Sequence, residues 1–275
     1  MAERFNSIKI NSGEKNGSKI ADQYNVAGVP HVIFTDAEGS EIDRLIGYSP
    51  PEEYIPMVKD ILNGVNTLPA LEKEYTEKSD DIDVWVKLAK KYSKMGRSDD
   101  AKNLYNQLIA ANPENRAEEL ETAHFYLAKY DWEQNDISSL TKFIAQFSSS
   151  THITSAWRLI ARYHSAQEDT SAEVEAMQKM AESDPENPGT LNSYAWRMTE
   201  LKLNLEDALI KARKGVELSD DDGKPMILDT EAEVLWLMGK PQEAIDVINR
   251  AIEMDPEDDY YKEQLEKFTE TLQES

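Results

Sequence analysis

The sequence contains no cysteine among its 275 residues. This absence excludes disulfides, cysteine–zinc sites, thiol nucleophiles and dithiol redox chemistry in this chain. It leaves the cellular compartment open, because a chain without thiols is compatible with reducing and oxidising surroundings alike.

Long apolar runs are also missing. No apolar stretch approaches the ~18 residues of a membrane-spanning helix, and residues 1–10 lack the apolar core of a signal peptide. We therefore expect a soluble protein with no membrane span. It is either cytoplasmic, as the sequence stands, or exported as the truncated product of a longer precursor.

Basic residues are outnumbered, with 30 Lys and Arg against 53 Asp and Glu and a formal net charge of -23. Bulk attraction to DNA, RNA or an anionic membrane is therefore disfavoured. Catalytic patterns are missing as well: there is no glycine-rich phosphate loop, and the histidines lack the spacing of metal ligands. These histidines are His31, His124, His152 and His164. We expect no metal site, no cofactor and no catalysis by this chain.

The clearest positive pattern runs from residue 82 to residue 115. Two apolar helical faces flank a break at Gly96, and Pro113 ends the unit. The faces consist of Trp85, Leu88, Ala89 and Tyr92, followed by Ala101, Leu104, Tyr105 and Leu108. This large–small–large pattern over about 34 residues resembles a tetratricopeptide repeat. Because such a helical hairpin cannot bury its apolar face alone, we expect neighbouring repeats.

Weaker versions of the pattern follow at residues 121–151, 154–185, 189–222 and 225–256, and residues 260–272 resemble a capping helix. The resemblance implies a right-handed solenoid of about five repeats over residues 81–275, whose first helices line a concave wall. A linker helix from Pro69 to Lys78, within residues 65–80, is expected to pack Leu68, Leu71 and Tyr75 on the first repeat. The fold class is mainly α, preceded by a small α/β unit.

Residues 1–64 have a different, mixed pattern. Phe5, Ile8 and Ile10 indicate a short strand, and Ser18 is expected to cap a helix that ends at Tyr24. Two further strands are expected around Val32–Phe34 and Ile42–Ile46, joined by a tight turn at residues 36–39. Ser49 is expected to cap a final helix that begins with Pro50 and Pro51.

This order resembles the second half of a thioredoxin domain. The likeness depends on a helix ending in Tyr24-Asn25-Val26, on Gly28-Val29-Pro30 before a strand, and on the Asp36-to-Gly39 hairpin. The resemblance implies a cis bond before Pro30 and makes Val29, Pro30 and His31 the loop that faces the redox cysteines in that family. Neither the Cys-x-x-Cys motif nor the first half of the domain is present. The favoured interpretation of this loop is a structural turn, and the alternative is contact with a peptide.

The missing half would contain the central strand of the sheet, so unpaired backbone groups are expected there. Three outcomes stay open: the remaining strands pair directly, another chain fills the gap, or the N-terminal strand is loose. A second copy of the chain that completes the sheet would give self-association.

The inward positions of the first helices form the candidate binding groove. They are mostly basic in the early and middle repeats and acidic in the fifth, where Asp229 and Glu233 lie. The candidate peptide-binding residues are Lys90, Lys94, Lys129, Trp132, Arg158, Arg162, Arg197 and Trp236. Since Arg158 and Arg162 are one helical turn apart, they could hold a carboxylate. Trp132 and Trp236 either pack or face the groove, whereas Trp85 and Trp157 are expected to pack.

We therefore predict a non-catalytic scaffold that binds a protein or peptide, with acidic segments or a C-terminal carboxylate as candidate ligands. The alternative is a fragment of a thioredoxin-like thiol–disulfide oxidoreductase or redox chaperone. An in-frame Trp-Cys-x-x-Cys and a signal sequence upstream of the first codon would favour the alternative.

Overall fold

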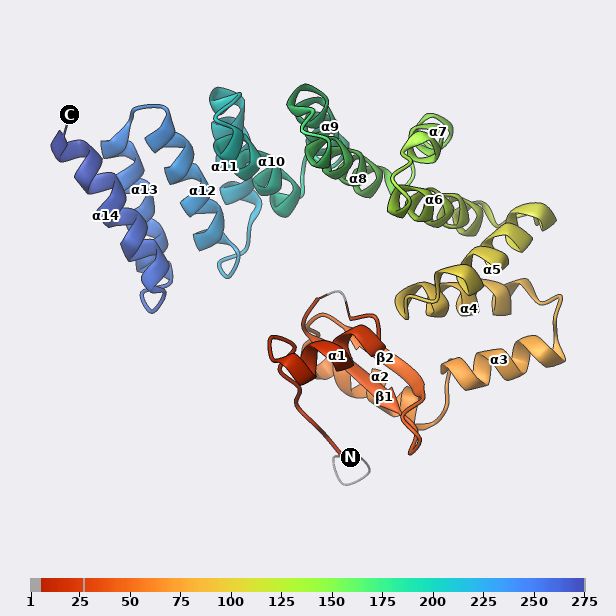
Figure 1. Cartoon of the computed structure of the whole chain (residues 1–275). Coiled ribbons are helices and arrows are strands. Elements are labelled where there is room, and N and C mark those ends of the chain that lie inside the picture. The colour runs from red at the N-terminus through yellow and green to blue at the C-terminus, as the bar shows by residue number, and fades with distance from the viewer. Residues whose placement is uncertain (1–5, 27, 275) are drawn as a thin grey trace. The chain divides into compact units, whose positions relative to one another are not determined.

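The computed structural model describes residues 6–26 and 28–274, except the side chains of residues 273 and 274. Fourteen helices and one two-stranded sheet occur in this part of the chain (Figure 1). The fold is mainly α, as expected. Two compact units divide the chain between Tyr130 and Asp131, inside one of the helices, and each unit is described by itself.

The first unit begins with a small α/β segment. Helix α1 (Lys15–Gln23) precedes strands β1 (His31–Thr35) and β2 (Glu41–Ile46), and helix α2 (Pro51–Leu62) follows them. The strands are antiparallel, and His31 lies opposite Ile46. Asp36 Oδ1 accepts hydrogen bonds from the backbone N–H groups of Glu38 and Ser40, and this closes the hairpin. The peptide bond between Val29 and Pro30 is cis, as the resemblance implied.

Three details differ from the sequence expectations. Ile8 and Ile10 lie outside any strand and are exposed, because the central strand that would lie beside them in the thioredoxin family is not in this chain. Phe5 lies outside the described residues. Helix α1 begins at Lys15, so Ser18 lies inside it with its N–H bonded to the Glu14 carbonyl. Pro50, whose backbone is extended, takes the N-cap position of α2 that was expected for Ser49.

This α/β segment has almost no apolar core of its own. Val58 is the one buried apolar residue among the described residues that precede Leu68. Its interior contains charge instead: Asp43 and Arg44 on β2 are both 4% exposed. Arg44 bonds through its guanidinium to Glu41 and to the Tyr24 carbonyl at 2.6 Å, which ties β2 to the end of α1.

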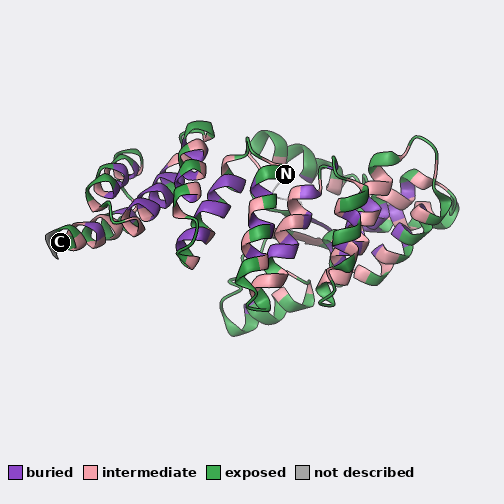
Figure 2. Ribbon diagram, turned by 90° about the horizontal axis from the view of Figure 1, so that it is seen from above, coloured by how far each residue is buried: buried purple, intermediate pink, exposed green. Residues whose placement is uncertain are grey.

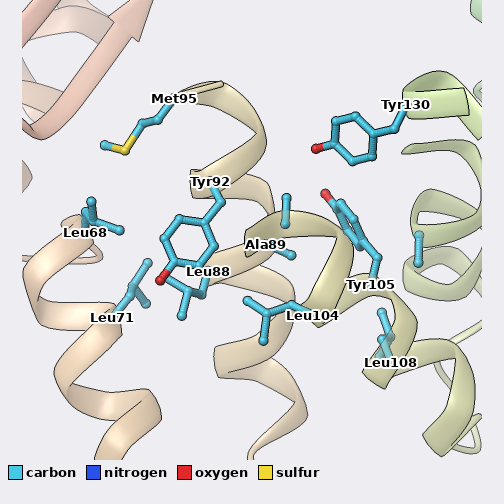
Figure 3. Packing of buried hydrophobic residues seen from close by; sticks show 12 residues of the cluster. Leu68, Leu71, Leu88, Ala89, Tyr92, Met95, Leu104, Tyr105, Leu108 and Tyr130 are labelled. Carbon is cyan, nitrogen blue, oxygen red and sulfur yellow. The ribbon is translucent and has the colours of Figure 1, made fainter. Parts of the chain in front are cut away.

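The first repeat contains the densest packing of the first unit. It consists of α4 (Ile82–Lys94) and α5 (Ser98–Ala111), with the linker helix α3 (Leu68–Glu77) against α4. Leu68 and Leu71 join its core, and Tyr75 packs on it, as predicted. Figure 3 shows the hydroxyl groups of Tyr105 and Tyr130 turned toward each other. Ser93 Oγ bonds to both, at 3.2 and 2.8 Å.

Two contacts join the α/β segment to the first repeat. Lys91 Nζ on α4 donates to both carboxylate oxygens of Asp43, at 2.7 and 2.6 Å. Asn25 Nδ2 donates to the carbonyl oxygen of Met95 at 3.3 Å, beside the turn between α4 and α5. Because the segment lacks its own core, these polar contacts are what we expect to hold it in place.

Gly96 in that turn provides a test of the contact with Asn25. Its φ is +71°, and a Cβ added there would lie 2.8 Å from the Cβ of Asn25. Gly239 is the matched control, because its φ is +74° and a Cβ there would meet nothing within 4 Å. We expect Gly239→Ala to lower the free energy of unfolding by about 1–2 kcal/mol through backbone strain alone.

Gly96→Ala should cost a further 1–3 kcal/mol, roughly, because Asn25 must move. Urea unfolding of both variants measures the difference. Asn25→Gly, at a position whose φ is +51°, should restore most of the additional loss. Equal losses at Gly96 and Gly239 would contradict the packing of Asn25 on this turn.

The remaining helices follow the repeat order that the sequence indicated. Helices α6 (Ala117–Glu133) and α7 (Ser138–Gln146) form the second pair in sequence, with Asn135 at φ +67° in their turn. The second unit continues with α8 (Ile153–Ala166), α9 (Thr170–Ser183), α10 (Pro188–Leu201) and α11 (Leu205–Leu218). It ends with α12 (Lys224–Leu237), α13 (Pro241–Met254) and α14 (Asp259–Glu274).

Most helices of these pairs bury one side and expose the other (Figure 2), whereas in α12 Met226 is the one exposed residue. A buried alanine occupies the equivalent position on the first helix of every repeat. These residues are Ala89, Ala128, Ala161, Ala195 and Ala232, each at most 3% exposed. They give a common register for comparing the first helices of the repeats.

Candidate binding groove

The buried alanines align equivalent positions of the first helices in the second unit. Three residues before each alanine lie Arg158, Asn192 and Asp229, and one residue after it lie Arg162, Trp196 and Glu233. At both positions the residue on α8 is a cation and the residue on α12 is an anion. The change of sign predicted from the sequence is therefore present on equivalent helical positions.

A groove of about 690 Å³ is lined by residues of α8, α9 and α10 and of the loop that precedes α10. Arg158 and Arg162 from α8 contribute the cationic side, and Trp196 and Arg197 come from α10. Met177 and Met180 of α9 also line it. The groove thus combines apolar surface with concentrated charge, which is the usual composition of a site for a peptide or small ligand.

The two α8 arginines are available for a ligand. Arg158 is half-buried and Arg162 is exposed. Throughout residues 6–26 and 28–274, neither guanidinium group makes a hydrogen bond or ion pair with the protein. An unpaired guanidinium presents several N–H donors in a planar fork that matches a carboxylate.

Arg197 was predicted to bind the ligand, but its guanidinium group is bonded within the protein. Its Nε donates to Glu173 Oε1 at 2.6 Å, and its Nη1 donates to Glu200 Oε2 at 2.7 Å. Its Nη2 reaches Ser165 Oγ at 3.1 Å. The two carboxylates raise the pKa of Arg197, with Glu173 as the main cause. Arg197 therefore links α8, α9 and α10 and sets the spacing of the groove walls.

Sequence reasoning missed Glu173, Met177 and Met180. Glu173 is 5% exposed and Met180 is fully buried, although α9 as a sequence is only weakly amphipathic. An acidic residue in the first turn of a helix usually interacts favourably with the helix dipole. The sequence therefore contained no indication that Glu173 is buried and paired with an arginine.

Trp196 and Trp236 have different surroundings. Trp196 lines the groove, is 36% exposed, and donates its indole N–H to Glu200 at 3.2 Å. Trp236 packs against α14: its indole N–H donates to Thr271 Oγ1 at 2.9 Å, and Lys267 Nζ lies 4.1 Å from its ring centroid. Of the two interpretations left open for Trp236, the structure favours packing.

The other predicted residues lie elsewhere. Lys90 and Lys94 are exposed on α4 and Lys129 is half-buried on α6, all in the first unit, whereas Trp132 is half-buried at the start of the second. None of these four residues lines the groove. In the cis-proline loop, Val29 and Pro30 are exposed, and His31 Nδ1 donates to the Gly28 carbonyl.

Asp229, the anion on α12 three residues before Ala232, is 5% exposed. Burial raises its pKa to about 6, opposed by the hydroxyl of Tyr260, which donates to Asp229 Oδ2 at 3.3 Å. Glu233 and Asp258 add to the rise, and Lys267 opposes it. Glu233 itself accepts from Lys267 at 2.6 Å. The acidic end of the wall is therefore occupied by side chains of α14.

The raised pKa of Asp229 gives a pH-dependent prediction. Between about pH 4 and pH 6 the folded protein holds a proton that the unfolded chain releases, so stability falls as the pH rises through this window. We expect Asp229→Asn to remove this dependence and to raise the free energy of unfolding at pH 7.5 by up to about 3 kcal/mol. Thermal unfolding across the pH range measures it. Asp246→Asn, at an exposed carboxylate of α13, is the control; the prediction is wrong if both variants behave alike.

The described chain contains no cluster of three or more His, Asp and Glu side chains arranged to bind a metal. Among the helices in the described ranges, none is both long and apolar enough to cross a membrane. His124 is half-buried, and burial lowers its pKa.

Fold and groove together define a repeat solenoid preceded by a small α/β segment. Comparison with known proteins gives the particular families. The family model described as a thioredoxin-like domain matches residues 2–62, and the model described as a tetratricopeptide repeat matches residues 82–115 and 230–258. The chain joins a thioredoxin-like segment to tetratricopeptide repeats, as the sequence indicated.

Among curated proteins, the chain is similar to the thioredoxin-like protein HCF164, chloroplastic, of Oryza sativa subsp. japonica. The two are 28% identical over 67 residues, which cover 24% of this chain and 26% of that protein. The chain therefore spans about a quarter of the length of this relative.

Among solved structures, the chain is similar to the MamA protein, at 16% identity and a TM-score of 0.48, over 64% of this chain and 92% of that one. It is also similar to YrrB, described as a TPR protein with an unusual peptide-binding site. That match has 13% identity and a TM-score of 0.49, over 71% of this chain and 97% of the other.

Proposed function

We propose that the chain is a non-catalytic scaffold that binds an acidic segment of a protein or peptide in the groove formed by α8, α9 and α10. The observation that carries this proposal is the pair of unpaired arginines, Arg158 and Arg162, in the groove that the exposed ring of Trp196 also lines. In a chain of net charge -23, two uncompensated cations in one groove are a local exception. They attract an anion and also fix where it binds.

The ligand chemistry follows from the lining. A carboxylate accepts hydrogen bonds from the two guanidinium groups, and each such charged bond contributes about 1.5–3 kcal/mol. The indole ring of Trp196, which lines the groove and is 36% exposed, offers apolar surface to an adjacent apolar side chain. An internal Asp or Glu and a C-terminal carboxylate offer the same chemistry, and the experiment separates them.

The alternative, a thiol–disulfide oxidoreductase, is favoured by the thioredoxin-like segment. The sequence provides no cysteine, so this chain supplies no thiol for exchange. The scaffold proposal uses side chains that are present and unpaired, and we prefer it for that reason.

Fluorescence anisotropy with labelled peptides tests the proposal. One peptide contains internal acidic residues next to apolar ones and an amidated C-terminus; a second is neutral except for its free C-terminal carboxylate; a third has the acids replaced by amides and is amidated. We expect the first or second peptide to bind and the third to bind at least tenfold more weakly. Equal binding by all three peptides, or none, overturns the proposal.

The matched variants place the binding in the groove. Arg158→Glu with Arg162→Glu should weaken binding by tenfold or more. Lys142→Glu with Arg250→Glu changes the net charge from -23 by the same four units, at two exposed positions outside the groove. This control should retain the original affinity. Equal losses in the two double variants would mean that only the overall charge of the protein matters.

A further inference from the structure

Strand β1 has one paired edge and one open edge. The sheet has two strands, β1 and β2, in the described part of the chain (Figure 1). The Gly47 N–H donates to the Pro30 carbonyl, so by antiparallel alternation Val32 and Phe34 direct their backbone groups toward β2. The backbone N–H and C=O groups of His31, Ile33 and Thr35 therefore face away from β2.

The strand itself carries no charged side chain or proline that would protect the open edge, although the hairpin has one irregularity in register, between Phe34 and Thr35. Natural edge strands often carry lysine or another charged residue, or a proline, and these discourage pairing with another strand. The five residues of β1, His31–Thr35, include no Lys, Arg, Asp, Glu or Pro. Val32, the second residue of this edge strand, is 38% exposed.

Exposed apolar side chains concentrate in the same segment. Of the 18 exposed large apolar residues among those described, ten lie between Ile8 and Val65. Three of them flank the sheet: Val29 is 76% exposed, Ile46 is 51% and Tyr48 is 84%. Apolar surface gathered around an unpaired strand is typical of a binding face.

We propose that β1 pairs with β1 of a second copy of this chain, antiparallel and centred on Ile33. This register is self-complementary, as a twofold interface requires. Ile33 lies opposite Ile33 of the second copy, Val32 opposite Phe34, and His31 opposite Thr35. Each of these is a favourable or neutral cross-strand pair, and none brings like charges together.

The backbone agrees with this register. Ile33 directs its N–H and C=O toward the open edge, so the central pair is a hydrogen-bonded one, and His31 opposite Thr35 is another. The two hairpins together form a four-stranded sheet, a size at which sheets become stable where an isolated hairpin is marginal. The pairing thus adds stability to the α/β segment, whose own apolar core is very small.

The absence of natural cysteine makes a direct test available. In a hydrogen-bonded antiparallel pair the Cα atoms are about 5.5 Å apart, which lies within the range for a disulfide. In Ile33→Cys, oxidation by diamide removes two electrons and two protons from two thiols and joins two copies at that residue. Ile46→Cys, on β2 of the same hairpin, is the matched control. We expect the full-length Ile33→Cys chain to cross-link several-fold faster than the control.

Light scattering on the unmodified full-length chain, over a concentration series at about 0.15 M salt, should show the mass rising from 31.3 kDa toward twice that value. Val32→Lys places a charge opposite Phe34 and brings the two introduced lysines to diagonal positions about 7–8 Å apart on one face of the sheet. It should leave the chain monomeric, whereas Ile46→Lys should still associate. A monomer at every concentration overturns the proposal. A dimer that Val32→Lys leaves intact, with cross-linking no faster than in the Ile46→Cys control, overturns the β1 interface.

Discussion

Replacing Lys91 with methionine is expected to lower the free energy of unfolding of the first unit by about 3–5 kcal/mol. Lys91 and Asp43 form an ion pair at 2.6 Å, with side-chain exposures of 16% and 6%. Without the ammonium group, the Asp43 carboxylate stays buried with its charge uncompensated. The removed bond also joins α4 to β2, so the α/β segment loses its strongest attachment.

Two controls separate this effect from an ordinary surface change. The side chains of Lys78 and Glu74 are 59% and 40% exposed, so Lys78→Met removes only an exposed ion pair and should change stability far less than Lys91→Met. Asp43→Leu combined with Lys91→Met should recover much of the loss, because no charge is left buried. Urea unfolding followed by circular dichroism measures all three. A Lys91→Met variant as stable as Lys78→Met would contradict this account of the attachment.

Replacing Arg197 with methionine is expected to cost a similar amount in the second unit, about 3–5 kcal/mol. The Glu173 side chain is 6% exposed and depends on Arg197 for its counter-charge. The same substitution frees Glu200 and Ser165, so the walls of the groove lose their common link. Binding should fall as a consequence of lost structure.

Arg158→Met is the matched comparison, because it removes the same side chain from the same groove without breaking a bond within the described chain. It should leave the free energy of unfolding within about 0.5 kcal/mol while weakening the binding of an acidic peptide. Denaturant unfolding and peptide titration on both variants give the two readouts. If Arg158→Met destabilised the protein as much as Arg197→Met, the division into a ligand-binding and a structural arginine would be wrong.

The helices of the solenoid were predictable because their signal is local. The stripe from Trp85 to Tyr92 repeats with the helical period, and Gly96 stops it at a turn with positive φ. From α8 to α14 of the second unit, each helix packs against the next one in sequence, so the order of helices along the chain also gives their packing order there. The hairpin of β1 and β2 was predictable for the same reason, from the turn residues at Asp36 and Gly39.

The errors arose where a second, distant segment decides the structure. Ile8 and Ile10 have the composition of a strand, but a strand forms only beside a partner. Arg197 has the spacing of a groove residue, and nothing near it in sequence reveals that Glu173, 24 residues away, takes up its charge. The Asp43–Lys91 pair, separated by 48 residues, was missed in the same way. Single-sequence patterns indicate which side of a helix is exposed, whereas the partner of an exposed charge depends on tertiary structure.

The central proposal is that Arg158 and Arg162 select an acidic ligand. A charge exchange tests it most directly: isothermal titration of the Arg158→Glu, Arg162→Glu chain with a peptide whose acidic residues have been replaced by lysines. We predict that the original chain binds the acidic peptide, that each single exchange abolishes binding, and that the double exchange restores it. Failure of the basic peptide to bind the reversed groove, while the acidic peptide still binds there, would contradict the proposal.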